Sequence, residues 1–371
     1  MTASRGRALL HLAAALDRRA APGAASFVEQ TQLAERGALD FVTLGDTFAR
    51  PGLDALAVLS RVAPVTGRIG LVPTVTTTHT EPFYVQAAVA TLDWVSRGRA
   101  GWQIEVSRTA AEARLFGRGT SELPPPHDRM TSSPSLDALW REAGEVADVA
   151  ARLWDSREDG AETGDGVTGR RVDRNRLHQV DFEGGTFSVK GPSTVPRPPQ
   201  GHPVRVVDAT EVSARRTAAR YADVALVRVA GPAQVQAVRA ELRDKAARFG
   251  RDPDELRVLA GLGVDLGEGE CAVEPGHGGG GARQTARGPL YRGGPVGLAE
   301  LIAAWHRADA VDGFHLTPVE PRRDLERLVN GTVALLQHRG LFRTFYPGST
   351  LREHLGLARP ANRYAGARRA S

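Results

Sequence analysis

Residues 69–107 read IGLVPTVTTTHTEPFYVQAAVATLDWVSRGRAGWQIEVS and contain one complete strand, helix and strand repeat. The apolar, β-branched run 69–77 predicts a buried strand, 82–95 has a helical pattern, and 101–107 predicts the next strand. This alternation is typical of a parallel sheet whose strands are connected by helices. We therefore interpret the rest of the chain as further copies of this unit.

The same alternation extends over most of the 371 residues. We expect eight strands, at 9–16, 41–46, 69–77, 101–107, 204–209, 224–229, 258–266 and 313–319. Helical patterns lie at 25–37, 53–64, 82–95, 135–154, 212–221, 233–249, 296–307 and 321–339. Eight such units predict an α/β fold, a (β/α)8 TIM barrel, in which ligands bind where the carboxyl ends of the strands meet the following loops. A doubly wound sheet would carry a glycine-rich phosphate loop after its first strand, and DRRAAPG at 17–23 is not one.

Two insertions interrupt the alternation in the single domain that we expect over residues 1–371. Residues 108–134, with three consecutive prolines, are expected to form a loop after the fourth strand. Residues 155–203 form an insertion before the fifth strand, with a hairpin whose strands, 180–182 and 186–189, flank Glu-Gly-Gly. Long insertions after barrel strands commonly shape substrate pockets.

Two further segments stand apart from the repeating units. The glycine-rich stretch 276–294 is expected to be a flexible linker or lid. The arginine-rich C-terminal tail, 339–371, contains leucine and phenylalanine residues, so we expect it to dock on the barrel rather than to bind phosphate.

Composition and charge narrow the possible partners. Lys and Arg number 48 against 43 Asp and Glu, a net charge of +5, and the arginines are spread along the chain, which does not indicate nucleic-acid binding. No apolar stretch approaches the roughly 20 residues of a membrane helix, and the N-terminus lacks a secretory core, so we expect a cytoplasmic protein. The single cysteine, Cys271, allows no internal disulfide, and the ten histidines are scattered, so we expect no metal site.

Polar residues recur where the predicted strands end. They are Asp46, Thr74, Thr76, Thr77, Gln103, Ser107, Asp208 and Thr210. Such a rim suits a ligand with many hydrogen-bonding edges, such as a flavin ring. Each residue also has a structural interpretation, since Asp46 could cap the next helix and Thr76 could simply favour a strand.

Several ordered motifs resemble the bacterial luciferase-like flavin monooxygenases, in particular the branch with nitrilotriacetate, dibenzothiophene-sulfone and long-chain-alkane monooxygenases. They are AERGALDFV (34–42), IGLVPTVTT (69–77), LDWVSRGRAGW (92–102), LWDS (153–156), FSVKGP (187–192) and TLREHLGL (350–357). The resemblance implies a (β/α)8 barrel that binds reduced FMN, uses O2 and acts on a small organic substrate. It also implies a separate NAD(P)H-dependent flavin reductase as partner, and a homodimer.

The resemblance also implies which residues bind the cofactor. Asp46, Thr74, Thr76 and Ser107 match positions on the flavin side of strands two to four, and Gln103 stands where the family usually has asparagine. Trp140 stands where the family has a tyrosine. Thr210 and Glu211 fall in the segment that supplies phosphate contacts. The resemblance names no catalytic residue and no particular substrate.

The phosphate segment departs from the family pattern. It reads Val-Asp-Ala-Thr-Glu at 207–211, where Asp208 and Glu211 would repel a phosphate and Ala209 replaces a glycine. Arg215 or Arg216 could offset these charges. Two alternatives therefore stay open: an F420-dependent hydride-transfer oxidoreductase on the same barrel, and a diverged, non-catalytic family member acting as a partner subunit.

Overall fold

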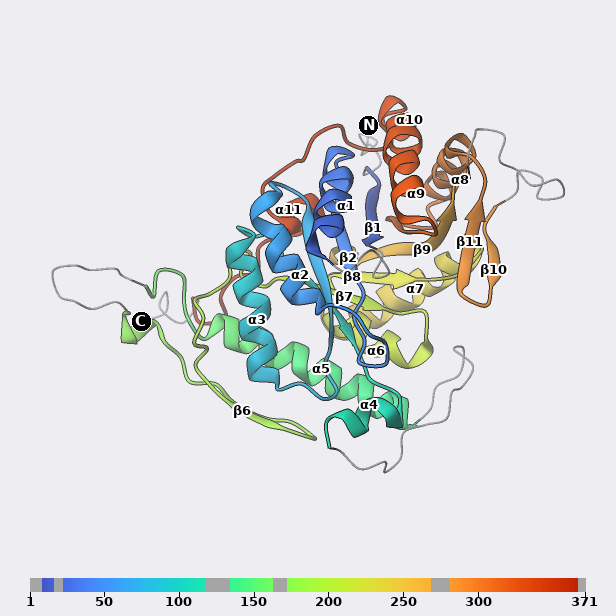
Figure 1. The fold of residues 1–371 in the computed structure, drawn as a ribbon. Coiled ribbons are helices and arrows are strands. Elements are labelled where there is room, and N and C mark those ends of the chain that lie inside the picture. The colour runs from blue at the N-terminus through green and yellow to red at the C-terminus, as the bar shows by residue number, and fades with distance from the viewer. Residues whose placement is uncertain (1–8, 17–22, 118–133, 163–171, 268–280, 366–371) are drawn as a thin grey trace, which may run out of the picture.

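The computed structural model describes residues 9–16, 23–117, 134–162, 172–267 and 281–365 (Figure 1). Within these ranges eight parallel strands close into a barrel: β1 (His11–Leu16), β2 (Phe41–Leu44), β3 (Gly70–Thr76), β4 (Gly101–Glu105), β7 (Val204–Asp208), β8 (Val224–Val227), β9 (Arg257–Asp265) and β12 (Gly313–Pro318). Strand β12 pairs with β1, with His11 opposite Gly313, and this pairing closes the ring. The predicted (β/α)8 barrel is confirmed.

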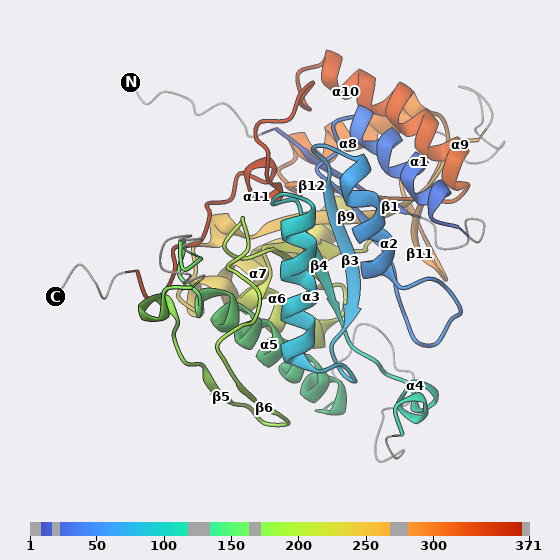
Figure 2. The same ribbon diagram turned by 60° about the vertical axis from the view of Figure 1, so that its left-hand side comes forward.

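Helices follow the barrel strands and surround them (Figure 2). They are α1 (Ala24–Arg36), α2 (Ala55–Val62), α3 (Pro82–Val95), α5 (Pro134–Asp155), α6 (Val212–Tyr221), α7 (Pro232–Arg248), α8 (Pro295–Arg307) and α9 (Pro321–Arg327), which continues as a π-helical segment (Leu328–Val333) into α10 (Ala334–His338). Five of them, α3, α5, α7, α8 and α9, begin with proline, whose fixed φ and missing N–H suit the first helical position. All eight predicted helical patterns correspond to helices.

Two predictions about irregular segments need correction. Residues 108–134 were expected to be a loop, but they contain the short helix α4 (Ala110–Leu115), whose N-cap Thr109 accepts a hydrogen bond from Glu112 N. Residues 276–294 were expected to be a linker or lid, but they contain the antiparallel hairpin β10 (Arg283–Thr285) and β11 (Gly288–Arg292), and β11 extends the sheet beside β9. Cys271, and the remainder of both segments at 118–133 and 276–280, lie outside the described residues.

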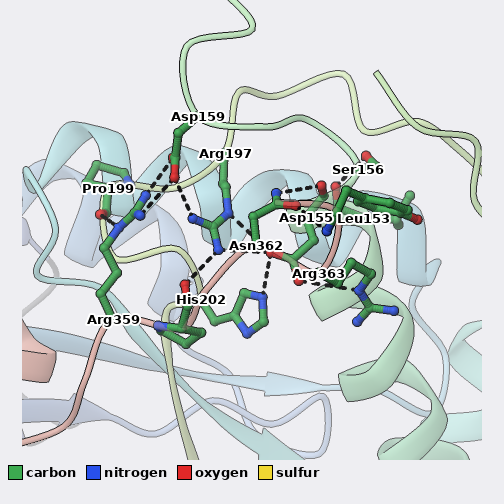
Figure 3. Close-up of polar contacts among 12 residues, drawn as sticks. Leu153, Asp155, Ser156, Asp159, Arg197, Pro199, His202, Arg359, Asn362 and Arg363 are labelled. Atoms are coloured by element: carbon green, nitrogen blue, oxygen red, sulfur yellow. Dashed lines mark hydrogen bonds and ion pairs between the residues drawn. The ribbon is translucent and has the colours of Figure 1, made fainter. Parts of the chain in front are cut away.

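The insertion before β7 forms the expected hairpin, in which β5 (Asp181–Glu183) pairs with β6 (Ser188–Lys190). Its base is fastened to the C-terminal tail by the polar network in Figure 3. Arg197 contacts Asp155 at 3.0 Å and Asp159 at 2.9 Å, and both its side chain and that of Asp155 are 2% exposed. Arg359 from the tail binds the same Asp159 at 2.7 Å, and Asn362 donates to the carbonyl of Asp155 at 2.8 Å.

The tail also fills the amino-terminal end of the barrel. The short helix α11 (Leu351–His354) begins with a capping box between Thr350 and Glu353. The side chains of Leu351, Leu355 and Leu357 join a buried cluster with barrel residues, namely Ala13, Phe41, Val72, Val204, Val206, Val224, Leu226 and Leu259. The fit is close, because a Cβ added at Gly70 would lie 2.6 Å from Leu351 Cδ1. Helices α11 and α4 lie at opposite ends of the barrel (Figure 2).

Charged contacts hold the tail in this position. Arg352 donates to Asp223 at 3.2 Å, and its backbone N–H donates to Gln200 Oε1 at 2.9 Å. Arg343 donates to the fully buried Asp40 at 2.8 Å, and Asp40 also accepts from Leu12 N. The tail is thus part of the barrel core rather than an appendage.

Replacing Leu351 by alanine should lower the free energy of unfolding by about 2–5 kcal/mol, because it leaves a cavity at the amino-terminal end of the barrel. Urea denaturation followed by circular dichroism measures this loss. Phe345→Ala serves as the control, because Phe345 is in the same tail but 77% exposed, and should change stability by less than about 0.5 kcal/mol. Equal stabilities of the two variants would contradict the role given to α11.

Candidate functional site

Three of the predicted residues come together at the carboxyl end of the barrel. Parallel pairing places Thr74 of β3 directly beside Gln103 of β4, and Thr76 beside Glu105. Gln103 is also paired with Val206, which belongs to the cluster inside the barrel, so this row of side chains faces the interior. Thr74, Thr76 and Gln103 are each 7% exposed.

The polar groups of these three side chains are unused by the protein. Among the residues that the structure describes, neither the two threonine hydroxyls nor the Gln103 amide makes a hydrogen bond. Their polar atoms are not among the fully enclosed side-chain atoms that lack a partner in the described residues, so they face the open end of the barrel. Three adjacent side chains with free polar atoms at the end of a barrel where ligands bind indicate a surface suited to a ligand's polar edge.

A cluster of charged side chains lies next to this surface. Arg228 follows β8 and contacts Asp208 at 3.0 Å. Arg108 follows β4 and contacts Glu211 at 2.5 Å and Glu105 at 3.8 Å. Burial raises the pKa of Glu105 to about 7; Asp208 adds to the shift, while Val106 N–H, Arg108 and Arg228 oppose it. Sequence reasoning missed Glu105, although its spacing of two from Gln103 places both on the same face of the strand.

The barrel interior below Arg228 is shaped to admit that side chain. A Cβ at Gly261 would lie 2.7 Å from Arg228 Cγ, so glycine is needed there. His315 on β12 shares a hydrogen bond with the Thr43 hydroxyl at 2.8 Å. Burial, assisted by the positive charge of Arg228, lowers the pKa of His315 to about 3, so this histidine is neutral at physiological pH.

Asp46 and Ser107, both predicted to contact a cofactor, have hydrogen-bond partners within the protein. The carboxylate of Asp46 accepts from Thr47 N at 2.7 Å and from Ala55 N, at the start of α2, at 2.9 Å. Ser107 is 1% exposed, and its hydroxyl donates to Glu112 at 2.9 Å. The contacts of Asp46 agree with the alternative interpretation that it holds the next helix.

Glu112 joins three segments at the barrel mouth. Besides Ser107, the hydroxyls of Thr47 and Thr109 donate to its carboxylate, each at 2.9 Å. These hydrogen bonds fix α4 against the ends of β2 and β4. Burial would raise the pKa of Glu112, but hydrogen bonds from Thr109, Thr47 and Ser107 lower it.

Apolar side chains stand above the mouth on the side of β2, β3 and β4. Phe116, at the end of α4, packs edge-on against Phe48 with ring centres 4.7 Å apart and stacks on His79 at 5.0 Å. Phe48 is 36% exposed, Phe116 40% and Leu115 68%. The mouth is therefore apolar on one side and charged on the side of β7 and β8.

The predicted phosphate segment follows β7 and is tightly held by the protein. The Thr210 hydroxyl accepts from Arg228 N at 2.9 Å, and Thr210 N donates to Asp208 at 3.0 Å. Arg215 donates to the carbonyls of Ala209 and Thr210 and to Glu241, so it supports the loop and cannot offset the acidic residues for a ligand. Instead, Arg228 and Arg108 neutralise Asp208 and Glu211.

A groove of about 460 Å³ runs between α5 and α6 and includes the first turn of α6. Its lining includes Arg141, Ser213, Arg216 and Arg220, together with the acidic side chains of Asp137 and Glu145. Ser213 is 7% exposed, and its hydroxyl has no hydrogen-bond partner in the described parts of the chain. The free N–H groups and positive dipole end of a helix favour an anion.

Trp140, the remaining candidate, lies in the core rather than on an open surface. It is 1% exposed, and its carbonyl accepts from Thr217 of α6 at 2.6 Å. Its indole N–H has no partner within the described ranges. In this structure Trp140 thus acts chiefly in packing α5 against α6.

The described residues contain no group of three or more histidine, cysteine or acidic side chains placed to hold a metal ion. In the same residues, no helix is long and apolar enough to cross a membrane.

Comparison with known proteins gives consistent matches. The sequence model of the family described as luciferase-like monooxygenase matches residues 3–292. The chain is 31% identical to nitrilotriacetate monooxygenase component A of Aminobacter aminovorans, over 91% of each protein. Its fold matches the crystal structure of a long-chain alkane monooxygenase with a TM-score of 0.80 at 20% identity, covering 94% of this chain and 96% of the other. It matches a riboflavin lyase, solved with modified FMN and riboflavin, with a TM-score of 0.78 at 20% identity, over 97% and 99%.

Glu112→Gln should lower the free energy of unfolding at pH 7 by about 1–3 kcal/mol, because the charged acceptor of three hydroxyl groups is lost. Since the pKa of Glu112 is lowered in the folded state, its stabilisation exists above the ordinary glutamate pKa of about 4.3 and is lost as the pH falls further. Urea denaturation at pH 7 and pH 3.5 should therefore show a difference from the wild type that shrinks in acid.

Glu326→Gln is the matched control, because Glu326 is half exposed and pairs only with Arg322 one helical turn away among the contacts described. It should change stability by less than about 0.5 kcal/mol at either pH. A Glu112→Gln difference that is absent at pH 7, or that grows in acid, would contradict the proposed hydrogen-bonded carboxylate.

Proposed function

The chain belongs to the luciferase-like monooxygenase family, and we propose that it is the oxygenating component of a two-component enzyme that uses reduced FMN and O2. The observation that carries the proposal is the row of buried, unpartnered polar side chains, Thr74, Thr76 and Gln103, at the carboxyl end of the barrel. The nitrilotriacetate relative supports the two-component arrangement, because its name identifies it as component A.

The row fits the polar edge of a flavin ring. An amide presents both a donor and an acceptor, and each threonine hydroxyl can do either, so the three side chains can match the alternating carbonyl and N–H groups of the ring. Their rigid placement on two adjacent strands favours a flat, extended ligand edge. FMN-bearing riboflavin lyase, which shares this fold, supports the choice of cofactor.

The groove at the start of α6 fits the phosphate of FMN. The Ser213 hydroxyl is an unused buried donor, Arg141 and Arg216 line the same groove, and the helix end favours negative charge. Asp208 and Glu211 do not oppose binding as strongly as their sequence suggests, because each is paired with an arginine.

When bound, reduced FMN supplies the electrons for splitting O2, with one oxygen atom passing to the substrate and the other to water. The chain's own residues bind, orient and shield. Thr74, Thr76 and Gln103 hold the polar edge of the ring, and Phe48, Phe116 and Leu115 provide an apolar surface that keeps water away. Glu112 keeps α4, and thereby Phe116, in place.

Partner and substrate complete the proposal. A separate NAD(P)H-dependent reductase delivers the reduced flavin, the substrate is a small organic molecule, and the chain acts as a homodimer. The exposed apolar side chains of α3, which include Tyr84 at 70% and Trp94 at 48%, are consistent with a protein contact.

Reduced FMN should bind at micromolar concentration in an anaerobic titration followed by protein fluorescence. Gln103→Leu and Thr74→Val should each weaken binding about 5- to 150-fold, because each leaves a polar group of the ring without its partner. Thr91→Val is the control, since Thr91 is exposed on α3 and bonds only its own helix. Absence of FMN binding, or binding of F420 alone, would contradict the proposal, and the latter result would favour hydride transfer.

Ser213→Ala should weaken binding of FMN about 5- to 10-fold and leave riboflavin binding unchanged, because only FMN carries the phosphate. Ser60→Ala, which removes a hydroxyl that bonds its own helix at Leu56 O, should change neither affinity. Isothermal titration calorimetry with the two ligands measures both. An equal loss for FMN and riboflavin would show that the phosphate does not lie at the start of α6.

A further inference from the structure

Glu105 differs from the other inward-facing residues of the candidate site in its charge and its exposure to solvent. It is the last residue of β4 and lies beside Thr76, in the same inward-facing row as Gln103. Its side chain is 30% exposed, whereas Gln103 and Thr76 are 7% exposed. Glu105 is therefore the carboxylate of the row that can meet both a ligand and water.

The groups around Glu105 come from each neighbouring element. Strand β3 contributes Thr76, which carries no charge, and the end of β7 contributes Asp208. Arg228 after β8, Arg108 after β4 and Glu211 at the start of α6 complete the charged surroundings. His315 on β12 is neutral and bonds Thr43.

The pairing among these groups leaves Glu105 without a close cation of its own. Arg228 is 3.0 Å from Asp208, and Arg108 is 2.5 Å from Glu211, but Arg108 is 3.8 Å from Glu105. Three carboxylates thus share two guanidinium groups. Adding a ligand removes water from the side chain that is least compensated, and desolvation favours the neutral form of a carboxyl group.

We propose that Glu105 is the proton-exchanging residue of this site: when a flavin fills the barrel mouth, its carboxyl shifts from the charged toward the protonated form and takes the proton from solvent. Flavin binding thus raises the fraction of Glu105 that is a carboxylic acid, whose O–H faces the bound ligand. The inference rests on the proposed flavin site. It gives that site a group that can release a proton near neutral pH, which neither the hydroxyl of Thr74 nor the amide of Gln103 can do.

The electrostatics of the empty protein agree with this role. Burial raises the pKa of Glu105 to about 7, so the carboxyl is divided between its two forms near neutral pH and a small further change in surroundings shifts the balance. A carboxyl group with a pKa near the working pH is well suited to both accept and release a proton.

The first test needs no ligand. Carbon-13 NMR of protein labelled at glutamate side-chain carboxyls should show one resonance that titrates near pH 7 and is missing from Glu105→Gln. A Glu105 resonance that titrates near the ordinary glutamate value of about 4.3 would overturn the inference. Asp208→Asn should move the midpoint to lower pH, because it removes a negative neighbour and releases Arg228.

The second test counts protons. Calorimetric titrations with FMN and with riboflavin at pH 7, in two buffers of different ionisation enthalpy, should show uptake of a fraction of one proton per flavin, since Glu105 is already partly protonated near this pH. Riboflavin excludes titration of the phosphate. Glu105→Gln, an isosteric change, should abolish the uptake, and Glu326→Gln, on the surface of α9, should leave it unchanged.

The outcomes separate this inference from the proposed function. Flavin binding with equal proton uptake in the wild type and Glu105→Gln would overturn the inference and leave the flavin site intact. If neither flavin binds to the wild type, the proposed function and proton uptake on binding both fail. If Glu105→Gln loses flavin binding, the pH dependence of proton uptake in Asp208→Asn decides. A shift of that uptake to lower pH supports the inference, and an unchanged pH dependence overturns it.

Discussion

The pairing of β12 with β1 is the constraint on which the rest of the structure depends. It closes the eight parallel barrel strands into a ring, so the interior can be reached only along the barrel axis. Leu351, Leu355 and Leu357 fill the amino-terminal end of that axis. Within the described residues, the polar row, the ion pairs and the aromatic cluster therefore all gather at the other end, where strand ends from distant parts of the sequence meet.

The fold could be read from the sequence because its signals are local. Each strand and helix carries its own periodicity, and Thr74, Thr76 and Gln103 stand out at strand ends. Two features were missed despite local signals: Thr109 and Glu112 have the spacing of a capping box at the start of α4, and Glu105 follows Gln103 by two residues. The short hairpin β10 and β11 was hidden by its glycine-rich surroundings.

The charges of the site could not be judged in the same way. From the sequence alone, Asp208 and Glu211 are expected to repel a phosphate, because a sequence shows residue types but not which ion pairs they form. The arginine that neutralises Glu211 lies 103 residues earlier in the chain, and Arg215, the nearer choice, is occupied with backbone carbonyls. The electrostatics of a barrel mouth depend on neighbours around the ring, which the order of residues along one chain does not reveal.

The position of the tail at the amino-terminal end of the barrel also affects the order in which the chain folds during synthesis. Ribosomes release the chain from its amino terminus, so β1 to β12 leave the exit tunnel before residues 351–357 do. Until then, the amino-terminal end of the barrel lacks the leucines of residues 351–357, which cover Phe41, Val72, Val204 and Leu259 in the folded protein. The nascent barrel therefore exposes an apolar opening until residues 351–357 emerge and dock, and Arg343 and Arg352 join their buried carboxylates only after all the barrel strands have been made.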